Sequence, residues 1–587
     1  MSAARSQAAI APFLISLALA LCGAALHLVY LLTYRDLNLS GDEAHYWEWS
    51  RRLDLSYYSK GPLVAYIIAA GRAMLGDWSR SIFGNDTLAV RGPAILLGVL
   101  TSLGVHALAA RVFRDGWIGT LAVALCATIP IMSVGGLLMT IDAPLVCAWV
   151  WCLYCVARGA EGWRGGAVEG RRSSSGGATL WWLAAGVLVA VGLLAKYNMV
   201  LAYLVVGIWL LMDQECRGWW RRPAVLTAAI VGLLGLVPIL IWNASHDWVS
   251  FRHVAGQAGV ADRVKFDLGA IAAYVGGQAA VIGPIWLVMM LVAIARLWKG
   301  ANANGELRVA IGELQSAHPA EPREASSPSA SSPLRPSTPR LLALAALVPW
   351  LFFLLFSPIT KIQPNWPAMA IPPATIALAW LIRTGWNATT GRAALRRWTV
   401  AGAAIGLGMV MIAHRADLLM PLFKQLARGA PPWDLTPTAK FDPTVRLRGW
   451  AQLGAAVGEV LNAERAAGRE PFILCDDYQL ASQVAFYAPG EPTVYSAASA
   501  LGRRRSQYDI WINPLRNAPD FVGRPCVYIG SLHTDEGISE AALAGPLPGL
   551  RLARSVEHRV QGEPVQIWTI YVCDAFAGFA GAAAEKY

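Results

Sequence analysis

Charged residues are scarce in this chain. Asp, Glu, Lys and Arg make up 15% of its 587 residues, whereas a soluble globular domain carries about 25%. Hydrophobic residues make up 56% and gather in continuous runs such as 8–33, 341–356 and 399–413. About 20 consecutive apolar residues span a bilayer as a helix, and only helices or closed barrels satisfy their backbone in lipid. Because the runs do not alternate with polar residues, the sequence predicts a polytopic α-helical membrane protein.

Paired cysteine motifs and internal repeats are lacking as well. Among the nine cysteines, the pair Cys152 and Cys155 has no second half and lies in an apolar run, so no metal-binding cysteine pattern stands out. Cys475, Cys526 and Cys573 lie in the polar C-terminal region, where one disulfide with one thiol left over is compatible with export. Transporters often show internal hydropathy repeats. The absence of such repeats argues against one possible function of the chain, that of a transporter or flippase for a polyprenyl-linked lipid.

Eleven apolar segments are predicted to cross the membrane. They are 8–33, 88–110, 117–134, 142–157, 178–195, 198–212, 223–242, 268–295, 341–357, 366–382 and 398–414. With the N-terminus in the cytoplasm, every even-numbered connection is basic, as the positive-inside rule requires. The net charge of +11 is explained by these arginines, so a nucleic-acid partner is not implied. An odd number of spans places the C-terminal region in the periplasm of a bacterial inner membrane.

The polar segments divide the chain into parts. These are 1–33, the first transmembrane helix; 34–87, an outer loop with helices at the interface; 88–300, the transmembrane core; 301–340, a cytoplasmic linker; 341–414, the last transmembrane helices; and 433–574, a periplasmic domain. Trp and Tyr in the outer loop suit a membrane interface. The Ser/Pro/Ala composition of the linker predicts disorder. The last part alternates helix-like segments, 450–468 and 478–486, with the β-rich segments PFILCD, PTVYSA, PCVYIG and VQIWTIYVC. This alternation predicts a small α/β domain.

The first outer loop carries acidic and basic candidates. Ionisable residues at membrane ends are costly and mark functional sites by default. Ser40 and Glu43 have the spacing of a capping box, so Glu43 either holds a helix start or takes part in chemistry. Asp42 falls in the first turn of that helix, where the dipole favours a carboxylate that can accept a hydroxyl proton. Lys60, before Gly61-Pro62, either extends to the interface or binds a lipid phosphate.

Other spans end in polar residues at the predicted outer face. Asp142 begins a span and is followed by Pro144, so helix capping competes with a functional role. Lys196 lies in a tight outer turn, where an anionic headgroup is its natural partner. Lys361 and the stretch Asn365-Trp366-Pro367 belong to an outer loop whose tryptophan can stack on a sugar or lie at the headgroups.

A metal site remains open at this stage. His246, Asp247 and His253 have side chains that bind metals, but no fourth ligand is evident, and hydrogen bonding at the interface is the alternative. A scaffold that only anchors a partner-binding outer domain is a further alternative. Eleven spans with acidic residues at their outer ends argue against it.

A series of motifs then points to a known family. They are, in order, DEAHYWEWSRRLDLSYYSKGPLVAYI, RGPAILLG, TIDAPL, LLAKYNMVL, IWNASHDWVSF, GGQAAVIGP and QPNWPA. They cover roughly residues 38–370, and YQLASQVAFYAPG and GRRRSQYDIW near the C-terminus are similar to the outer domain of one bacterial branch. The chain thereby resembles the bacterial glycosyltransferase family 39 proteins of the GT-C superfamily. That family is related to protein O-mannosyltransferases and to the aminoarabinose transferase that modifies lipid A.

The resemblance implies a glycosyltransferase that takes a monosaccharide from a polyprenyl-phosphate donor with inversion. In such enzymes an acidic residue of the first outer loop is essential, and here that position is Asp42, so 34–87 is read as the catalytic loop. Glu43 and Asp142 complete the catalytic candidates. The Lys of the family's loop motif falls at Lys60, and Lys196 matches a basic residue near the carrier phosphate. The remaining residues assigned to substrate binding are Tyr58, Lys361, Asn365, Trp366 and His246.

Departures from the family pattern limit what the resemblance implies. The loop motif reads Ser-Lys-Gly-Pro instead of the Glu-Lys-Pro-Pro of aminoarabinose transferases, and Ser59 replaces a glutamate suggested as a metal contact. Neither a divalent metal nor that particular sugar is therefore implied. The outer domain is not the β-trefoil of eukaryotic protein mannosyltransferases. The expected acceptor is accordingly lipid A or another envelope glycan, with a protein as the alternative.

Overall fold

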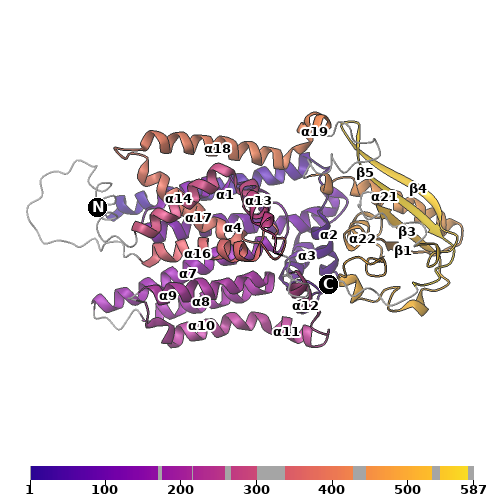
Figure 1. Cartoon of the computed structure of the whole chain (residues 1–587), viewed down its shortest axis with the longest axis horizontal. Helices are drawn as coiled ribbons and strands as arrows, with labels where there is room; N and C mark the ends of the chain where they lie inside the picture. The colour runs from indigo at the N-terminus through magenta and orange to yellow at the C-terminus, as the bar shows by residue number, and fades with distance from the viewer. Residues whose placement is uncertain are drawn as a thin grey trace, which may run out of the picture. The chain divides into compact units, whose positions relative to one another are not determined.

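The computed structural model of the chain describes residues 2–169, 175–213, 216–257, 266–300, 337–426, 444–531 and 543–579. They form two compact units (Figure 1). Unit 1 comprises Met1–His27, Ala94–Leu240 and Arg263–Val410, and unit 2 comprises Leu28–Pro93, Ile241–Asp262 and Met411–Tyr587. The predicted linker 301–340 lies outside the described residues except for its last four positions.

Unit 1 is built from helices. They are α1 (Ser2–Thr33), α4 (Thr87–Phe113), α5 (Gly116–Cys126), α6 (Pro130–Gly135), α7 (Asp142–Glu169), α8 (Ser175–Ala195), η2 (Tyr197–Val200), α9 (Leu201–Met212), η3 (Trp219–Arg221), α10 (Pro223–Leu233), η4 (Leu234–Leu236), α11 (Val237–Ala244), α13 (Gly269–Ile282), α14 (Pro284–Gly300), α16 (Ser337–Phe356), η5 (Ala368–Ala370), α17 (Ile371–Gly385) and α18 (Arg392–His414). The ends of α1, α4, α11 and α18 belong to unit 2.

The polytopic helical fold is confirmed. In the described part of the chain, eight helices are long and apolar enough to cross a membrane, or up to nine if a bent pair counts as one span. Every predicted segment coincides with helical structure. The predicted number of eleven is not established, because α5 and the segment Tyr197–Met212 are shorter than the roughly 20 residues that a span needs.

The predicted span 268–295 is not one straight helix. Its two halves, α13 and α14, meet at an angle of 101°. Gly283 at the break has a φ of +100°, which only glycine adopts without strain. Pro284 turns the preceding residue away from helical geometry and begins the next helix. This break was not predicted from the sequence because the segment is uniformly hydrophobic, although the pair Gly283-Pro284 is a signal for one.

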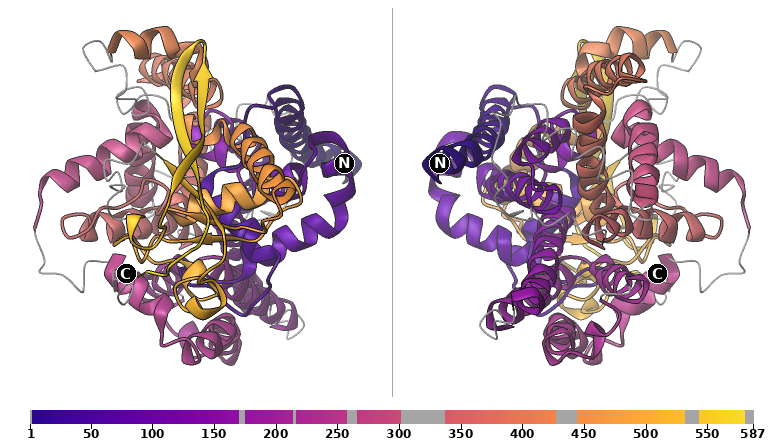
Figure 2. Two further views of the ribbon diagram at one scale, coloured as in Figure 1. Left: turned by 90° about the vertical axis from the view of Figure 1, so that its right-hand side faces the viewer. Right: turned by 90° about the vertical axis from the view of Figure 1, so that its left-hand side faces the viewer.

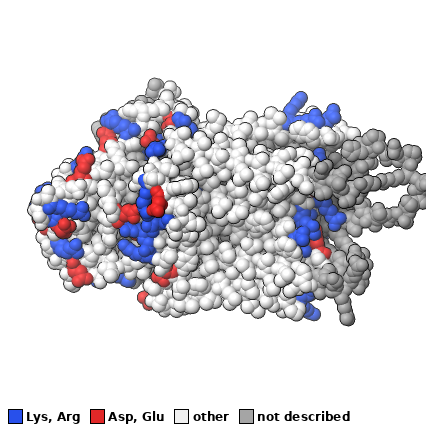
Figure 3. All heavy atoms as spheres, turned by 180° about the vertical axis from the view of Figure 1, so that it is seen from behind, with Lys and Arg blue, Asp and Glu red and all other residues white. Residues whose placement is uncertain are grey.

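The surface of unit 1 suits a lipid environment. Figure 2 views the helices nearly end-on, and apolar side chains such as Leu26, Ile230 and Met411 are exposed on them. The face of this unit in Figure 3 is bare of charge along most of its length and carries Lys and Arg at one end. An uncharged band bordered by basic residues is typical of a membrane protein.

Unit 2 combines helices with a β-sheet. Its helices are α2 (Gly41–Ser50), α3 (Leu63–Phe83), α12 (Val249–Gln257), η6 (Ala416–Leu419), α19 (Met420–Leu426), η7 (Val445–Leu447), α21 (Trp450–Ala466), α22 (Tyr478–Tyr487), η8 (Gln507–Asp509) and η9 (Ala518–Asp520). Its strands are β1 (Phe472–Cys475), β2 (Val494–Ser496), β3 (Cys526–Ser531), β4 (Arg551–Val560) and β5 (Glu563–Cys573). Helix α2 packs against both α3 and α22.

The five strands form a single mixed sheet in the order β2-β1-β3-β5-β4. β1 pairs in parallel with β2 and β3, whereas β5 runs antiparallel to β3 and β4. From β1 the chain passes through α22 to β2 on one side, and later returns to β3 on the other. β1 and β3 therefore flank a point where the strand order reverses, and ligands bind outside the carboxyl ends of strands at such points.

Two features of this sheet differ from the sequence prediction. Strand β4 was not predicted, because its charged, mostly exposed residues hide the pattern, and such charge is how an edge strand avoids aggregation. Gln561 and Gly562, both with positive φ, form its tight turn to β5. The disulfide considered for the C-terminal cysteines is not formed, since Cys475, Cys526 and Cys573 are all buried thiols.

Candidate active site

Asp42 lies in the first turn of α2 with an exposed side chain. The Ser40 hydroxyl accepts from the Glu43 N–H at 3.2 Å, and Glu43 Oε2 accepts from the Ser40 N–H at 2.9 Å. The predicted capping box is therefore formed. It fixes the start of α2 and holds the Asp42 carboxylate at a helix N-terminus, where the dipole favours its negative charge.

Glu43 is fully buried. Arg91 Nε and Nη2 donate to its two carboxylate oxygens at 3.0 and 2.9 Å. The same guanidinium donates to the Leu37 and Asn38 carbonyls at 3.1 and 2.8 Å. With both oxygens occupied and no exposure, Glu43 ties the outer loop to the start of α4. Of the two alternatives left open by the sequence, this geometry favours the structural one.

Helix α22 approaches Asp42 closely. Gln479 Nε2 donates to Asp42 Oδ1 at 3.3 Å and lies 3.4 Å from the Tyr478 hydroxyl. A Cβ atom at Gly41 would lie 2.8 Å from Cβ of Gln479, closer than real Cβ contacts. Gly41 is thus required by the close contact between α2 and α22.

The start of α22 coincides with the sheet position at which ligands are expected. Asp477 follows β1 and caps the helix, because its Oδ1 accepts from the Gln479 and Leu480 N–H groups at 2.6 and 2.9 Å. Tyr478 and Gln479 therefore stand at the carboxyl end of β1, beside the reversal of strand order. Two independent indications of a binding site therefore coincide: the carboxyl end of β1 beside the reversal of strand order, and the Asp42 carboxylate on α2.

A neutral histidine joins these elements beneath the surface. His45 Nε2 accepts from Trp49 Nε1 at 3.2 Å, and its Nδ1 lies 3.1 Å from the Ser482 hydroxyl on α22. The Ser482 hydroxyl is also 3.0 Å from the Tyr508 hydroxyl. Burial, followed by the charge of Arg504, lowers the pKa of His45 to about 3. The motifs YQLASQ and RSQYDIW thus both contact the helix that carries Asp42.

The loop that carries Lys60 is held rigidly. The Tyr57 and Trp49 rings stack at 4.3 Å, and the Tyr57 N–H donates to the Lys60 carbonyl at 3.2 Å. The Tyr58 N–H donates to Gln507 Oε1 at 2.7 Å. Tyr58 itself is 1% exposed and packs against Trp242. Its burial indicates that it supports the loop, whereas Lys60 is only partly buried.

The histidines of the metal hypothesis do not converge. The His246 ring stacks on Trp242 at 4.0 Å, and its Nδ1 lies 2.8 Å from the Trp242 carbonyl. His253 instead contacts Arg504, whose Nη2 is 3.0 Å from His253 Nε2. Among the described residues, no group of three or more His, Cys, Asp or Glu is arranged to hold a metal. His246 keeps its own turn in shape, as in the hydrogen-bonding alternative.

A second group of predicted residues meets within unit 1. Lys196 Nζ lies 2.6 Å from Asp142 Oδ1, with both side chains largely buried. Asn365 Nδ2 donates to Asp142 Oδ2 at 2.7 Å. The backbone carbonyl of Trp366 accepts from Asn198 at 3.2 Å. Lys361 is exposed on the same loop. Asp142 is therefore an ion-paired carboxylate that orients a lysine and an asparagine.

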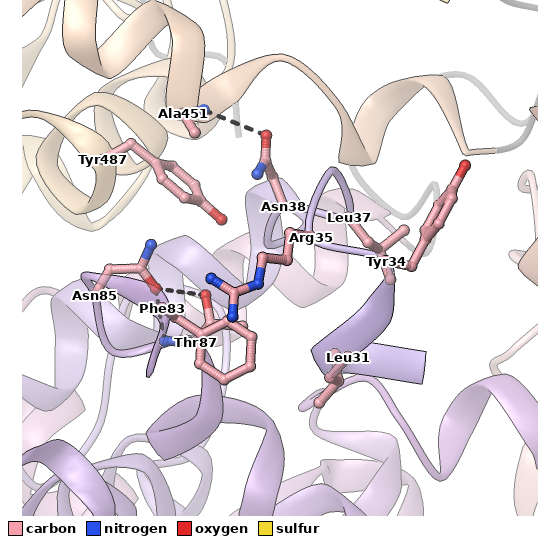
Figure 4. A pocket seen from close by; sticks show the side chains of 10 residues that line it. All are labelled: Leu31, Tyr34, Arg35, Leu37, Asn38, Phe83, Asn85, Thr87, Ala451 and Tyr487. Atoms are coloured by element: carbon pink, nitrogen blue, oxygen red, sulfur yellow. Dashed lines mark hydrogen bonds between the residues drawn. The ribbon is translucent and has the colours of Figure 1, made fainter. Parts of the chain in front are cut away.

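Unit 2 contains a small cavity, whose lining residues are drawn in Figure 4. Its volume of about 90 Å³ holds about three waters. It is lined by Leu31, Tyr34, Arg35, Leu37, Asn38, Phe83, Asn85, Thr87, Ala451 and Tyr487. None of these belongs to the predicted site, and we assign it no substrate.

Sequence reasoning missed four residues around Asp42. They are Tyr478, Gln479, Arg504 and His45. The signal was present, since the first three stand in the two C-terminal motifs YQLASQVAFYAPG and GRRRSQYDIW. What the sequence did not reveal is that a segment more than 400 residues downstream packs against α2.

Comparisons with known proteins agree with the motif-based prediction. The family model described as dolichyl-phosphate-mannose-protein mannosyltransferase matches residues 59–242. The lipid A galacturonosyltransferase of Rhizobium johnstonii is 28% identical over 48% of this chain. An undecaprenyl phosphate-alpha-4-amino-4-deoxy-L-arabinose arabinosyl transferase of Sodalis glossinidius is 27% identical over 34% of it. The matches span 55% and 35% of the lengths of these two relatives.

A solved structure extends the similarity to nearly the whole chain. The transferase ArnT of Cupriavidus metallidurans, solved bound to undecaprenyl phosphate, matches 94% of this chain and 97% of its own length. The TM-score is 0.53 at 15% sequence identity, so this likeness concerns the fold alone. The resemblance to GT-C glycosyltransferases predicted from the motifs is confirmed.

Proposed function

We propose that this chain, which has the fold of the GT-C glycosyltransferases, transfers a monosaccharide from a polyprenyl-phosphate donor to an envelope acceptor. The observation that carries the proposal is the exposed Asp42 carboxylate at the N-terminus of α2, held by Gln479 at 3.3 Å. The described part of the chain holds eight helices, or up to nine with the bent pair, that could cross a membrane. The named activities of the matched relatives support a sugar transfer that uses a lipid-linked donor.

The proposed reaction is a single displacement. The acceptor hydroxyl transfers its proton to the Asp42 carboxylate while its oxygen forms a bond to the anomeric carbon of the sugar. The bond between that carbon and the phosphate oxygen breaks on the opposite face, and the electron pair leaves with polyprenyl phosphate. One bond forms and one breaks at the carbon, so the configuration inverts.

The choice of Asp42 over the other acids follows from their surroundings. Glu43 is buried in a bidentate pair with Arg91, and Asp142 is paired with Lys196. A carboxylate already engaged with a cation is a poor proton acceptor, because protonation would leave that cation unpaired. Asp42 has only a neutral amide as its hydrogen-bond partner in the described part of the chain.

Lysines are proposed to bind the carrier phosphate. Lys60, in the loop after α2, and Lys196, oriented by Asp142, are each candidates for the positive charge that stabilises a leaving phosphate. Lys361 is an exposed third candidate. The named ligand of the ArnT structure, undecaprenyl phosphate, supports a carrier of this type.

We further propose that Asp42 works on the periplasmic face of the inner membrane and that the acceptor is lipid A or another glycan. The basic cytoplasmic connections support this orientation. The matched lipid A galacturonosyltransferase supports a lipid acceptor. The description of the matching family model favours a second candidate, transfer to a protein.

The test uses purified protein in lipid with labelled polyprenyl-phosphate sugars, envelope lipid extract and envelope protein. Wild type should label the lipid extract, and Asp42→Asn should lose at least about 100-fold of the rate, within the range for removal of a general base. Asp36→Asn, an exposed carboxylate in the same loop, is the matched control and should be unaffected. Equal rates for wild type and Asp42→Asn would refute the role of Asp42, and label in the protein fraction would select the second candidate.

A further inference from the structure

Arg504 stands out among the arginines of its loop. It follows β2 at the carboxyl edge of the sheet, in the motif GRRRSQYDIW. Its neighbour Arg503 forms an ion pair with Asp476 at 3.2 Å. Within the described ranges, no carboxylate forms an ion pair with Arg504, although its side chain is exposed. An exposed guanidinium without a carboxylate partner keeps its donor groups available.

The immediate partner of Arg504 does not neutralise it. Arg504 Nη2 lies 3.0 Å from His253 Nε2, so the imidazole accepts from the guanidinium. Burial, together with the charges of Arg504 and Lys60, lowers the pKa of His253 to about 3. His253 is therefore uncharged, and Lys60 lies near enough to act on it electrostatically. Arg504 and Lys60 place positive charge beside His253, whereas the carboxylates of Asp42 and Asp477 act on the neighbouring Tyr478.

Arg504 is linked to Asp42 through two side chains, those of Tyr478 and Gln479. Its guanidinium carbon lies 5.6 Å from the centroid of the Tyr478 ring. The Tyr478 hydroxyl is 3.4 Å from the Gln479 amide that donates to Asp42. A substrate that meets Asp42 and extends along Tyr478 would reach Arg504.

We propose that Arg504, backed by Tyr478 and His253, binds an oxyanion, a phosphate or carboxylate, carried by the substrate whose hydroxyl meets Asp42. The planar guanidinium fork matches such groups with two parallel hydrogen bonds. The inference rests on the proposed function and adds to it: the C-terminal domain selects an acidic acceptor. A carboxylate on the transferred sugar is the other source of the same chemistry.

The test compares substrates that differ only in charge. Two short-chain glycolipid acceptors are used, with and without a phosphate beside the accepting hydroxyl, and two polyprenyl-phosphate donors, one neutral sugar and one uronic acid. Wild type should prefer the phosphorylated acceptor about tenfold or more in kcat/KM, as one charge-assisted contact allows. Arg504→Gln should abolish the preference through KM, with a much larger loss for the phosphorylated acceptor than for the neutral one.

Two further variants keep the result interpretable. Arg554→Gln, an exposed arginine on β4 that pairs with Glu459, removes the same charge at the opposite edge of the sheet and should keep the preference. Arg504→Lys keeps the charge and loses the fork, so it should reduce the preference several-fold. If Arg504→Gln does not fold, the preference of Arg504→Lys for the phosphorylated acceptor tests the proposal instead.

The outcomes separate this inference from the proposed function. Loss of preference for the uronic acid donor instead of the phosphorylated acceptor supports the oxyanion site and assigns it to the sugar. Unchanged preferences in folded Arg504 variants overturn it. If wild type transfers no sugar, the proposed function fails. The oxyanion site is then tested by measuring how tightly the protein binds the phosphorylated acceptor. Binding about tenfold weaker in Arg504→Gln then supports the site, and equal binding overturns it.

Discussion

At the residue scale, three acids with similar sequence contexts have different surroundings. Asp42 faces an amide, Glu43 is enclosed by Arg91, and Asp142 is paired with Lys196. The sequence predicted all three as catalytic candidates because each stands at a helix start near a predicted outer face. The three acids differ because each meets a different partner from a distant segment, and spacing along the chain does not reveal these partners.

The contact between Gln479 and Asp42 predicts a shift in pH dependence. Gln479→Glu places a second carboxylate beside Asp42, and a like charge disfavours the ionised form. The acidic limb of the pH–rate profile of sugar transfer should therefore move to higher pH, with maximal rates recovered in alkaline buffer. Gln479→Leu, which adds no charge, serves as the control and should leave the position of the limb unchanged. If the acidic limb does not move in Gln479→Glu, residue 479 does not influence the group that accepts the proton.

The buried pair of Glu43 and Arg91 predicts a stability effect. Glu43→Gln leaves a buried guanidinium without its countercharge, which typically costs about 3–5 kcal/mol. The melting temperature and the folded yield should both fall, as thermal unfolding in detergent would record. The double variant Glu43→Gln with Arg91→Met should recover part of the loss. A stable Glu43→Gln protein that no longer transfers sugar would instead return Glu43 to the reaction.

At the element scale, the start of α22 against the start of α2 positions the site. Gly41→Ala introduces a Cβ atom 2.8 Å from Cβ of Gln479, so one of the two helices must shift. We expect transfer to fall several-fold and the melting temperature to decrease. Gly207→Ala in α9, where an added Cβ meets no atom within 4 Å, should be neutral or slightly stabilising. Equal behaviour of the two variants would contradict the close contact.

Two buried histidines, His45 on α2 and His253 on α12, predict an acid-sensitive unit 2. Burial lowers the pKa of both His45 and His253 to about 3, whereas an unfolded histidine titrates near 6.5. Between these values the unfolded state binds more protons, so stability is full above about pH 6.5 and falls as the pH decreases. At pH 5 each histidine costs about 2 kcal/mol.

Hydrogen exchange of α2 and α22 at pH 7.5 and pH 5, corrected for intrinsic rates, measures this loss. His45→Asn should weaken the dependence on pH by about half. A wild type with the same protection at both pH values would show that these histidines do not stay neutral in the folded state.

Sequence reasoning succeeded for elements with a strong local signal. The apolar runs, the helices α21 and α22 and four of the five strands were predicted near their observed bounds. It failed for β4, whose charged residues suit an edge position, and at Gly283, where one dihedral angle breaks a uniform apolar run. Hydrophobicity reports only average burial. It therefore reveals neither the position of β4 at the edge of the sheet nor the backbone conformation of Gly283.

At the scale of the whole molecule, sequence order and compact units do not coincide. Unit 2 assembles Leu28–Pro93, Ile241–Asp262 and Met411–Tyr587, which the sequence assigned to separate parts. Long-range pairs such as Asp42 with Gln479 and Tyr58 with Gln507 hold these segments together. A contiguous division of the chain could not anticipate them, because the motifs that pair are separated by hundreds of residues.

The central claim is that Asp42 promotes transfer of a sugar with release of its lipid carrier. The most direct measurement counts transferred sugar and free polyprenyl phosphate in one reaction, in lipid nanodiscs, for wild type and Asp42→Asn. The account predicts equal amounts of both products for wild type, inverted configuration at the anomeric carbon, and at least about 100-fold less of each for the variant with donor binding retained. Equal product from Asp42→Asn, or donor movement without carrier release, would contradict it.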